Sequence, residues 1–312
     1  MTTHPPLRQA LADYLALRRA LGFKLKAVGR ILGHFVDFLD TQGAGAPTIE
    51  QAVTWANQPE HAAQSWRAIR LSAARGFMTY LHSLDPAVAV PPGDLIRHGP
   101  DRATPYLFSP EQITDLLTAA GTLRPPLRAA TYQTLIGLLV VTGLRVGEAI
   151  RLDTDDLDTS SGLLTIRDTK FGKTRQVPLH ASTVTALNNY VNVRDNAHPV
   201  PACPALLVSI TGTRLQHSTI GLTFQRLTRT AGIVRRSAAC RPRPHDLRHG
   251  FAVATVLDWY HAGTDVESMM PYLATYLGHG DPKHSYWYLS AAPELMALAA
   301  GRLEDHLQQG QS

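Results

Sequence analysis

Six side chains in the second half of the sequence could together cleave a phosphodiester. They are a phenol, two guanidinium groups, an amine and two imidazoles, and in chain order they are Arg145, Lys170, His245, Arg248, His279 and Tyr288. A phenol can act as a nucleophile, guanidinium groups hold the oxygens of a phosphate, and an amine or imidazole can protonate a leaving oxygen. The set therefore predicts cleavage of a phosphodiester without a metal or any other cofactor.

The spacing of these residues is more informative than any one of them. Arg145 lies in Thr-Gly-Leu-Arg-Val-Gly-Glu, and Lys170 stands eight residues before Pro178 in a Val-Pro-Leu segment. His245 and Arg248 are three residues apart, and the histidine of Leu-Gly-His precedes the tyrosine by nine. In this pattern the chain resembles the tyrosine recombinases, the phage-integrase family of DNA strand-exchange enzymes. The resemblance is strong over about residues 109–292 and looser over the rest.

The resemblance implies a role for each of the six side chains. Tyr288 would attack the phosphate to give a 3′-phosphotyrosyl link and a free 5′-hydroxyl, and Lys170 would protonate the leaving oxygen. The two arginines would clamp the phosphate. The first histidine would assist proton transfer at the tyrosine, and the second would hydrogen-bond the phosphate. Because the covalent link conserves bond energy, no ATP is needed, and the sequence has no Gly-x-x-x-x-Gly-Lys loop.

Neighbouring residues compete for some of these roles. Tyr286 is the rival nucleophile, and Lys173 is a rival acid that ranks behind Lys170 on its spacing to the Val-Pro-Leu segment. His245 and His249 are four apart, which is the spacing of a zinc-binding helix. The arginine between them would repel a cation and no further ligand cluster follows, so we expect no metal and assign His249 to packing.

The charge of the chain agrees with a nucleic-acid partner. It has 30 basic and 25 acidic residues, for a net charge of +5, and only five of the basic residues are lysines. Arginine suits phosphate because its planar fork donates two parallel hydrogen bonds. The stretch from Arg214 to Arg248 contains eight arginines and one acid, Asp246. We interpret this stretch as part of an electrostatic footprint for double-stranded DNA.

The first part of the chain is expected to be a helical bundle. Apolar residues recur at helical spacing from Leu7 until Gly22, and again over about residues 24–41. Thr48 with Gln51 forms a capping box for a third helix, and residues 61–83 form a fourth that carries Trp66 and Ile69 among its apolar positions. Prolines then break the pattern. We predict three parts: an N-terminal helical core-binding DNA-binding domain at 1–84, a proline-rich linker at 85–108 and a catalytic domain at 109–312.

The catalytic domain is predicted to be mainly α with a small β-hairpin, an α+β fold. Ser109 and Pro110 begin a helix, and an apolar helix over about 127–142 ends at Gly143, which places Arg145 at a helix break with Glu148 on the same face. Residues 162–179 alternate as strands do, with Gly172 in the turn and Lys170 at the mouth of the hairpin. Pro244 begins the helix that carries His245 and Arg248.

The remaining features bear on location and partners. The chain has two cysteines, Cys203 and Cys240, which excludes a disulfide framework and suits a reducing cytosol. Its N-terminus has neither a signal peptide nor a membrane span, so we expect a cytoplasmic, nucleoid-associated protein with no membrane partner.

Three functions stay open at this point. A site-specific recombinase, acting as a homo-oligomer such as a tetramer on paired DNA sites with possible accessory proteins, is favoured. A type IB topoisomerase-like enzyme and a non-catalytic DNA-binding protein of the same fold are the alternatives. The residues from Ser285 to Leu289 resemble recombinases carried by transposons and other mobile elements.

Overall fold

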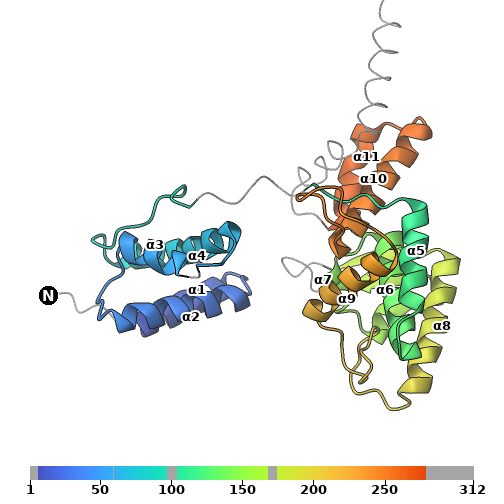
Figure 1. Cartoon of the computed structure of the whole chain (residues 1–312), viewed down its shortest axis with the longest axis horizontal. Coiled ribbons are helices and arrows are strands. Elements are labelled where there is room, and N and C mark those ends of the chain that lie inside the picture. The colour runs from blue at the N-terminus through green and yellow to red at the C-terminus, as the bar shows by residue number, and fades with distance from the viewer. Residues whose placement is uncertain (1–5, 59, 97–103, 168–173, 279–312) are drawn as a thin grey trace, which may run out of the picture. The chain divides into compact units, whose positions relative to one another are not determined.

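The computed structural model describes residues 6–58, 60–96, 104–167 and 174–278. The chain divides into two compact units, residues 1–102 and 103–312, shown in Figure 1. No helix in the described ranges is long and apolar enough to cross a membrane. The predicted fold class, mainly helical with a small antiparallel sheet, is confirmed.

The first unit is a bundle of helices whose ends follow local sequence rules. The helices are α1 (Leu7–Ala20), α2 (Lys26–Thr41), α3 (Ile49–Asn57) and α4 (Gln64–Leu84). Gly22 follows α1 with φ of +88°, a left-handed conformation that suits a residue without a side chain. Thr48 and Gln51 form the predicted capping box, in which each side chain accepts a hydrogen bond from the other residue's backbone N–H.

Aromatic side chains fill the core of the first unit. Phe35 of α2 and Trp55 of α3 pack with ring centroids 4.8 Å apart, and Phe77 of α4 is fully buried. Trp66 and Ile69, counted among the apolar positions of the fourth helix, are 42% and 47% exposed. They are not part of this core, because α4 buries a different face, to which Ala68 and Leu71 belong.

The predicted linker is partly packed at both ends. Val88 belongs to the core of the first unit, and Arg75 donates hydrogen bonds to the carbonyl oxygens of Pro91 and Pro92. At the other end, Tyr106 is buried in the core of the second unit. Proline has no backbone N–H and so cannot donate to a regular backbone pattern, and here an arginine side chain supplies the donors for two proline carbonyl oxygens. Residues 97–103 lie outside the described part of the chain.

The second unit is built around α6 (Pro126–Thr142), which packs against α5 (Pro110–Gly121), α8 (Ala181–Ala197) and α10 (Pro244–His261). Most of its apolar residues are buried, on more than one face of the helix, as expected of a central helix, although Val141 is exposed. The other elements are α7 (Val146–Ala149), β1 (Leu157–Asp158), β2 (Leu163–Ile166), β3 (Arg175–Pro178), α9 (His217–Thr230) and α11 (Val266–Leu277).

The sheet is antiparallel with strand order β1-β2-β3. Leu164 pairs with Val177, and both face the core, while Ile166 pairs with Arg175. The two strands of the predicted hairpin are therefore confirmed. Its turn, with Lys170 and Gly172, lies outside the described residues.

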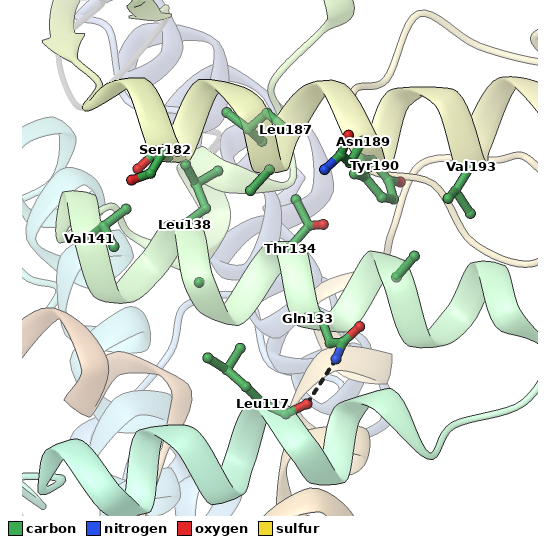
Figure 2. Close-up of a pocket in the computed structure, with 14 residues that line it drawn as sticks. Leu117, Gln133, Thr134, Leu138, Val141, Ser182, Leu187, Asn189, Tyr190 and Val193 are labelled. Carbon is green, nitrogen blue, oxygen red and sulfur yellow. Dashed lines mark hydrogen bonds between the residues drawn. The ribbon is translucent and has the colours of Figure 1, made fainter.

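A groove of about 550 Å³ runs between α6 and α8, with Leu117 of α5 at its edge, as Figure 2 shows. Gln133 reaches from α6 to α5, where its Nε2 donates to the carbonyl oxygen of Leu117 at 3.2 Å. The lining contains apolar and neutral polar side chains but no charged one. A groove of this composition does not suit a phosphate, so the site for the predicted chemistry has to be sought elsewhere.

Candidate active site

The end of α6 places the first predicted catalytic residue. Gly143 ends the helix with φ of +60°, and a Cβ at this position would lie 2.5 Å from the ring of Phe251. Only glycine fits both the conformation and the space. The chain therefore turns sharply and presents Arg145 as the residue that precedes α7, as predicted.

Glu148 joins Arg145 to a second arginine. Its carboxylate accepts hydrogen bonds from the Arg145 backbone N–H at 3.0 Å and from Arg145 Nη1 at 2.8 Å. Arg175, at the start of β3, donates to the same carboxylate through Nη2 at 2.8 Å and Nη1 at 3.3 Å. The Glu148 side chain is 2% exposed, so this is a buried ion pair and not a surface one.

The two arginines control the protonation of this carboxyl. Burial by itself raises the pKa of Glu148, but the hydrogen bonds and charge of Arg175, with those of Arg145, lower that pKa to about 2. The carboxylate is therefore charged at neutral pH. A charged Glu148 fixes the direction of the Arg145 guanidinium, whose side chain remains 34% exposed.

Arg248, the second predicted arginine, is buried on the first turns of α10. Its Nη1 donates to the carbonyl oxygen of Gly143 at 2.8 Å, and its Nη2 donates to that of Leu277 at 2.7 Å. The first bond ties α10 to the turn after α6. The second ties it to the end of α11.

The two predicted arginines meet at the end of α11. Arg145 Nη1 lies 3.4 Å from the carbonyl oxygen of Leu277, the same atom that Arg248 binds, and Arg145 Nη2 donates to the carbonyl of Gly278 at 3.2 Å. Gly278 ends the helix with φ of +68°. These residues directly precede His279 in the sequence. The structure thus brings together Arg145 and Arg248, which are 103 positions apart in the sequence. The carbonyl oxygen that both contact belongs to a residue 132 positions after Arg145.

The histidines of the α10 motif differ in exposure. His245 is exposed in the first turn of α10, while His249 is buried one turn later. Their rings lie 4.7 Å apart between centroids, nearly at right angles. An exposed histidine beside a buried arginine suits a role in proton transfer, and the buried ring of His249 suits the packing role predicted for it.

Asp246 holds the start of α10 in place. It is fully buried and accepts hydrogen bonds from Arg243, from the backbone N–H at 2.8 Å and from Nη2 at 3.0 Å. Burial raises the pKa of Asp246, and the bonds to Arg243 oppose that rise. By accepting a hydrogen bond from the N-cap backbone N–H, the Asp246 carboxylate fixes the first turn of α10, which carries His245 and Arg248.

Three of the six predicted residues lie outside the described part of the chain, namely Lys170, His279 and Tyr288. Their rivals Lys173 and Tyr286 lie outside it as well. The positions and roles of these five residues stay predictions.

The arginine-rich stretch has two kinds of member. Arg214 pairs with Asp153 and with carbonyl oxygens, and Arg236 stacks on Tyr106 with 4.7 Å from Cζ to the ring centroid. Arg243 and Arg248 have the intramolecular partners given above. The other four are exposed and form no ion pair with a described residue: Arg226, Arg229, Arg235 and Arg241. About half of the arginines in the expected footprint therefore have partners within the fold.

Two contributors to the site had no clear signal in the sequence. Arg175 is the first residue of β3, and no pattern in the sequence indicates that it contacts Glu148. The carbonyl oxygens of Leu277 and Gly278 carry no residue-type signature at all. Only the glycine before His279, as a helix-ending residue, pointed to this turn.

Comparison with known proteins agrees with this geometry. Residues 107–294 match the model of the phage integrase family. The Sinorhizobium fredii protein y4rB, which carries the name integrase/recombinase, is 43% identical over 303 residues, covering 95% of this chain and 96% of the relative. The tyrosine recombinase XerC of Alcanivorax borkumensis is 32% identical over 182 residues, covering 58% of this chain and 57% of the relative.

A solved structure extends the likeness to the fold of the whole chain. The integrase of transposon Tn1549, determined in complex with transposon right-end DNA, superimposes with a TM-score of 0.65 at 17% identity, covering 96% of this chain and 99% of that one. At this identity the match concerns the fold. Together with the family match and the 43% identical relative, it shows that the chain belongs to the phage integrase family and is a tyrosine recombinase, a DNA-cleaving and rejoining enzyme.

Proposed function

We propose that this chain is a site-specific recombinase that acts on double-stranded DNA through a covalent 3′-phosphotyrosyl link to Tyr288. The observation that carries the proposal is the meeting of Arg145 and Arg248 at one carbonyl oxygen, that of Leu277, next to the segment that begins with His279. Two guanidinium groups in one place can bind both non-bridging oxygens of a phosphate.

The two arginines contribute differently to this clamp. Arg248 is buried and fixed by two carbonyl oxygens, so it acts as the rigid part. Arg145 is one-third exposed and is oriented by Glu148, so it is the guanidinium that reaches the phosphate from the protein surface. Positive charge held in place before the reaction stabilises the charge that develops on the phosphate in the transition state.

Proton transfer belongs to residues around the clamp. We assign Lys170 as the general acid that protonates the leaving 5′-oxygen. The hairpin that carries it is formed by the antiparallel strands β2 and β3, in which Ile166 pairs with Arg175. Arg175 in turn contacts Glu148, which holds Arg145. His245, exposed at the start of α10, would assist proton transfer at the tyrosine, and His279 would hydrogen-bond the phosphate.

We also propose an oligomeric state and a cellular location for the reaction. The reaction exchanges strands between two duplexes, so we expect a homo-oligomer, a tetramer on paired sites, formed in the cytoplasm on chromosomal or mobile-element DNA. A type IB topoisomerase-like enzyme would share the cleavage chemistry but would relax a single supercoiled duplex as a monomer. Relaxation of a plasmid that lacks a recombination site, at a rate equal to that of a plasmid with one, would favour that alternative.

The nucleophile is tested with a nicked suicide substrate that carries the inverted repeats flanking the gene. Wild type and Tyr286→Phe should both form a covalent protein–DNA adduct, while Tyr288→Phe should bind the DNA and form none. We expect both tyrosines on one short helix, where residues two apart point about 200° from one another, so only one of the two phenols would face the phosphate. An adduct that survives in Tyr288→Phe but disappears in Tyr286→Phe would reverse the assignment. No adduct from the wild type on its own repeats would favour a non-catalytic DNA-binding protein.

A further inference from the structure

A second positively charged site lies at the opposite end of α6 from the arginine clamp. A hollow of about 240 Å³ opens where the turn between α5 and α6 meets the last turns of α9. Three arginines line it, Arg124, Arg128 and Arg226, together with two threonines and two leucines. The 17 residues of α6 separate the two ends by about 25 Å, so the hollow is distinct from the site of cleavage.

The three arginines form no ion pair with an acid in the part of the chain that the structure describes. Arg124 and Arg226 are exposed, and neither forms an ion pair with a described residue. The elements that build the hollow carry no acid, since none occurs between Asp115 and Glu148 or between Asp195 and Asp246. Three like charges around one cavity repel each other, and that repulsion is relieved when an anion enters.

Arg128 is already oriented by contacts with neighbouring side chains. Arg128 is half-buried, its Nη2 lies 3.3 Å from Thr223 Oγ1, and its Cζ lies 6.0 Å from the centroid of the Tyr132 ring. These contacts restrict the side chain, so less conformational entropy is lost when it binds a ligand. The positive end of the α6 dipole adds to the potential, since the helix begins at Pro126, two residues after Arg124.

We propose that this hollow, the α5–α6 arginine pocket, binds a phosphate group. Arginine side chains match phosphate oxygens in geometry and charge, and a cavity of this size holds a phosphate or a pyrophosphate. The phosphate could belong to DNA beyond the cleavage site or to a free phosphorylated molecule. The two sources share the same recognition chemistry and are separated by experiment.

The test uses the exposed pair of arginines and a matched control. The double variant Arg124→Gln/Arg226→Gln removes two positive charges from the pocket and leaves the packed Arg128 in place. The control Arg229→Gln/Arg235→Gln removes the same charge from exposed positions that do not line it. All four residues are exposed, so both double variants should fold, which far-UV circular dichroism checks.

In the first arm, pyrophosphate binding to the full-length protein is measured by calorimetry at constant ionic strength. Wild type and control should bind alike, and the pocket variant should bind at least about tenfold more weakly, because charge-assisted hydrogen bonds are lost. An equal loss in both double variants would make the effect one of net charge and would overturn the pocket.

In the second arm, binding of a long duplex is measured against salt concentration for wild type and pocket variant. If the pocket holds a DNA phosphate, the plot of log K against log salt should become shallower by about 0.9, the contribution of one lost phosphate contact. An unchanged slope together with pyrophosphate binding would identify a free phosphorylated ligand. No pyrophosphate binding and an unchanged slope would overturn the proposal. Neither arm requires cleavage, so its failure leaves the proposed recombinase activity untouched.

Discussion

Replacement of Glu148 by glutamine tests whether the buried ion pair organises the active site. The carboxylate receives hydrogen bonds from Arg145 and Arg175 and is almost completely buried. A glutamine keeps the shape but leaves the Arg175 guanidinium, which is 14% exposed, without its counter-charge. Removing one partner of a buried pair costs about 3–5 kcal/mol of folding stability.

The pKa of Glu148 gives a second measure of the same interaction. A carboxyl whose pKa falls from 4.5 in the unfolded chain to about 2 in the folded one contributes about 3 kcal/mol of stability at neutral pH. This contribution is fully present above pH 4.5 and disappears as the pH falls through about 2. At about pH 3 it should have dropped by about half.

The assay is urea denaturation of wild type, Glu148→Gln and a control, Glu111→Gln, at pH 7 and at about pH 3. Glu111 is an exposed glutamate in the first turn of α5, so its variant should stay within about 0.5 kcal/mol of the wild type. Glu148→Gln should lose about 3 kcal/mol at pH 7 and clearly less at the lower pH. A loss below about 0.5 kcal/mol at pH 7, or one that is the same at both pH values, would refute the role of this pair.

Two further predictions concern residues around the clamp. Lys170→Ala should slow cleavage by about 10²–10⁴-fold with little loss of DNA binding, and a 5′-thiol leaving group, which needs little protonation, should restore the rate; absence of rescue would transfer the acid role to Lys173 or His245. Gly278→Ala should slow cleavage and lower the melting temperature more than Gly263→Ala does. Both glycines have φ near +70°, but only at Gly278 would a Cβ clash with a side chain, 2.7 Å from Arg175 Nη1. Equal effects in the two variants, measured by thermal unfolding and by adduct formation, would show that backbone strain alone is responsible.

Local sequence rules predicted the helix boundaries well. The capping boxes at Thr48 and Ser109 and the glycine stops at Gly22 and Gly143 depend only on residues within one or two turns, so they can be identified without tertiary structure. The helices α8 and α9 were not predicted. The sequence of α8 is polar and buries Tyr190 and Arg194 by specific hydrogen bonds, which leaves its hydrophobic pattern weak.

The active site was predicted through the family pattern and not through periodicity. Nothing in the spacing of Arg145 and Arg248 shows that both guanidinium groups reach one carbonyl oxygen, because that contact depends on how α10 packs on α6. The acceptors themselves are backbone atoms of Leu277 and Gly278. Backbone groups are the same in every residue, so a sequence reveals them only where conformation requires a glycine.

The arginine-rich stretch shows why charge alone is an incomplete guide to a DNA-binding surface. Arg214 is paired with Asp153, 61 positions away, and Arg248 is bonded to carbonyl oxygens 105 and 29 positions away, so no local window of the sequence shows that the fold already holds these two side chains. Both are hydrogen-bonded within the fold, whereas Arg226 has no acidic partner among the described residues and lines a cavity with two other arginines. Arg214, paired with Asp153, acts as a structural brace, whereas an arginine that makes no ion pair keeps its charge available to a ligand. The charge available to DNA or another anion is therefore set by the acidic partners that the fold provides, and in the α5–α6 arginine pocket the described part of the fold provides none.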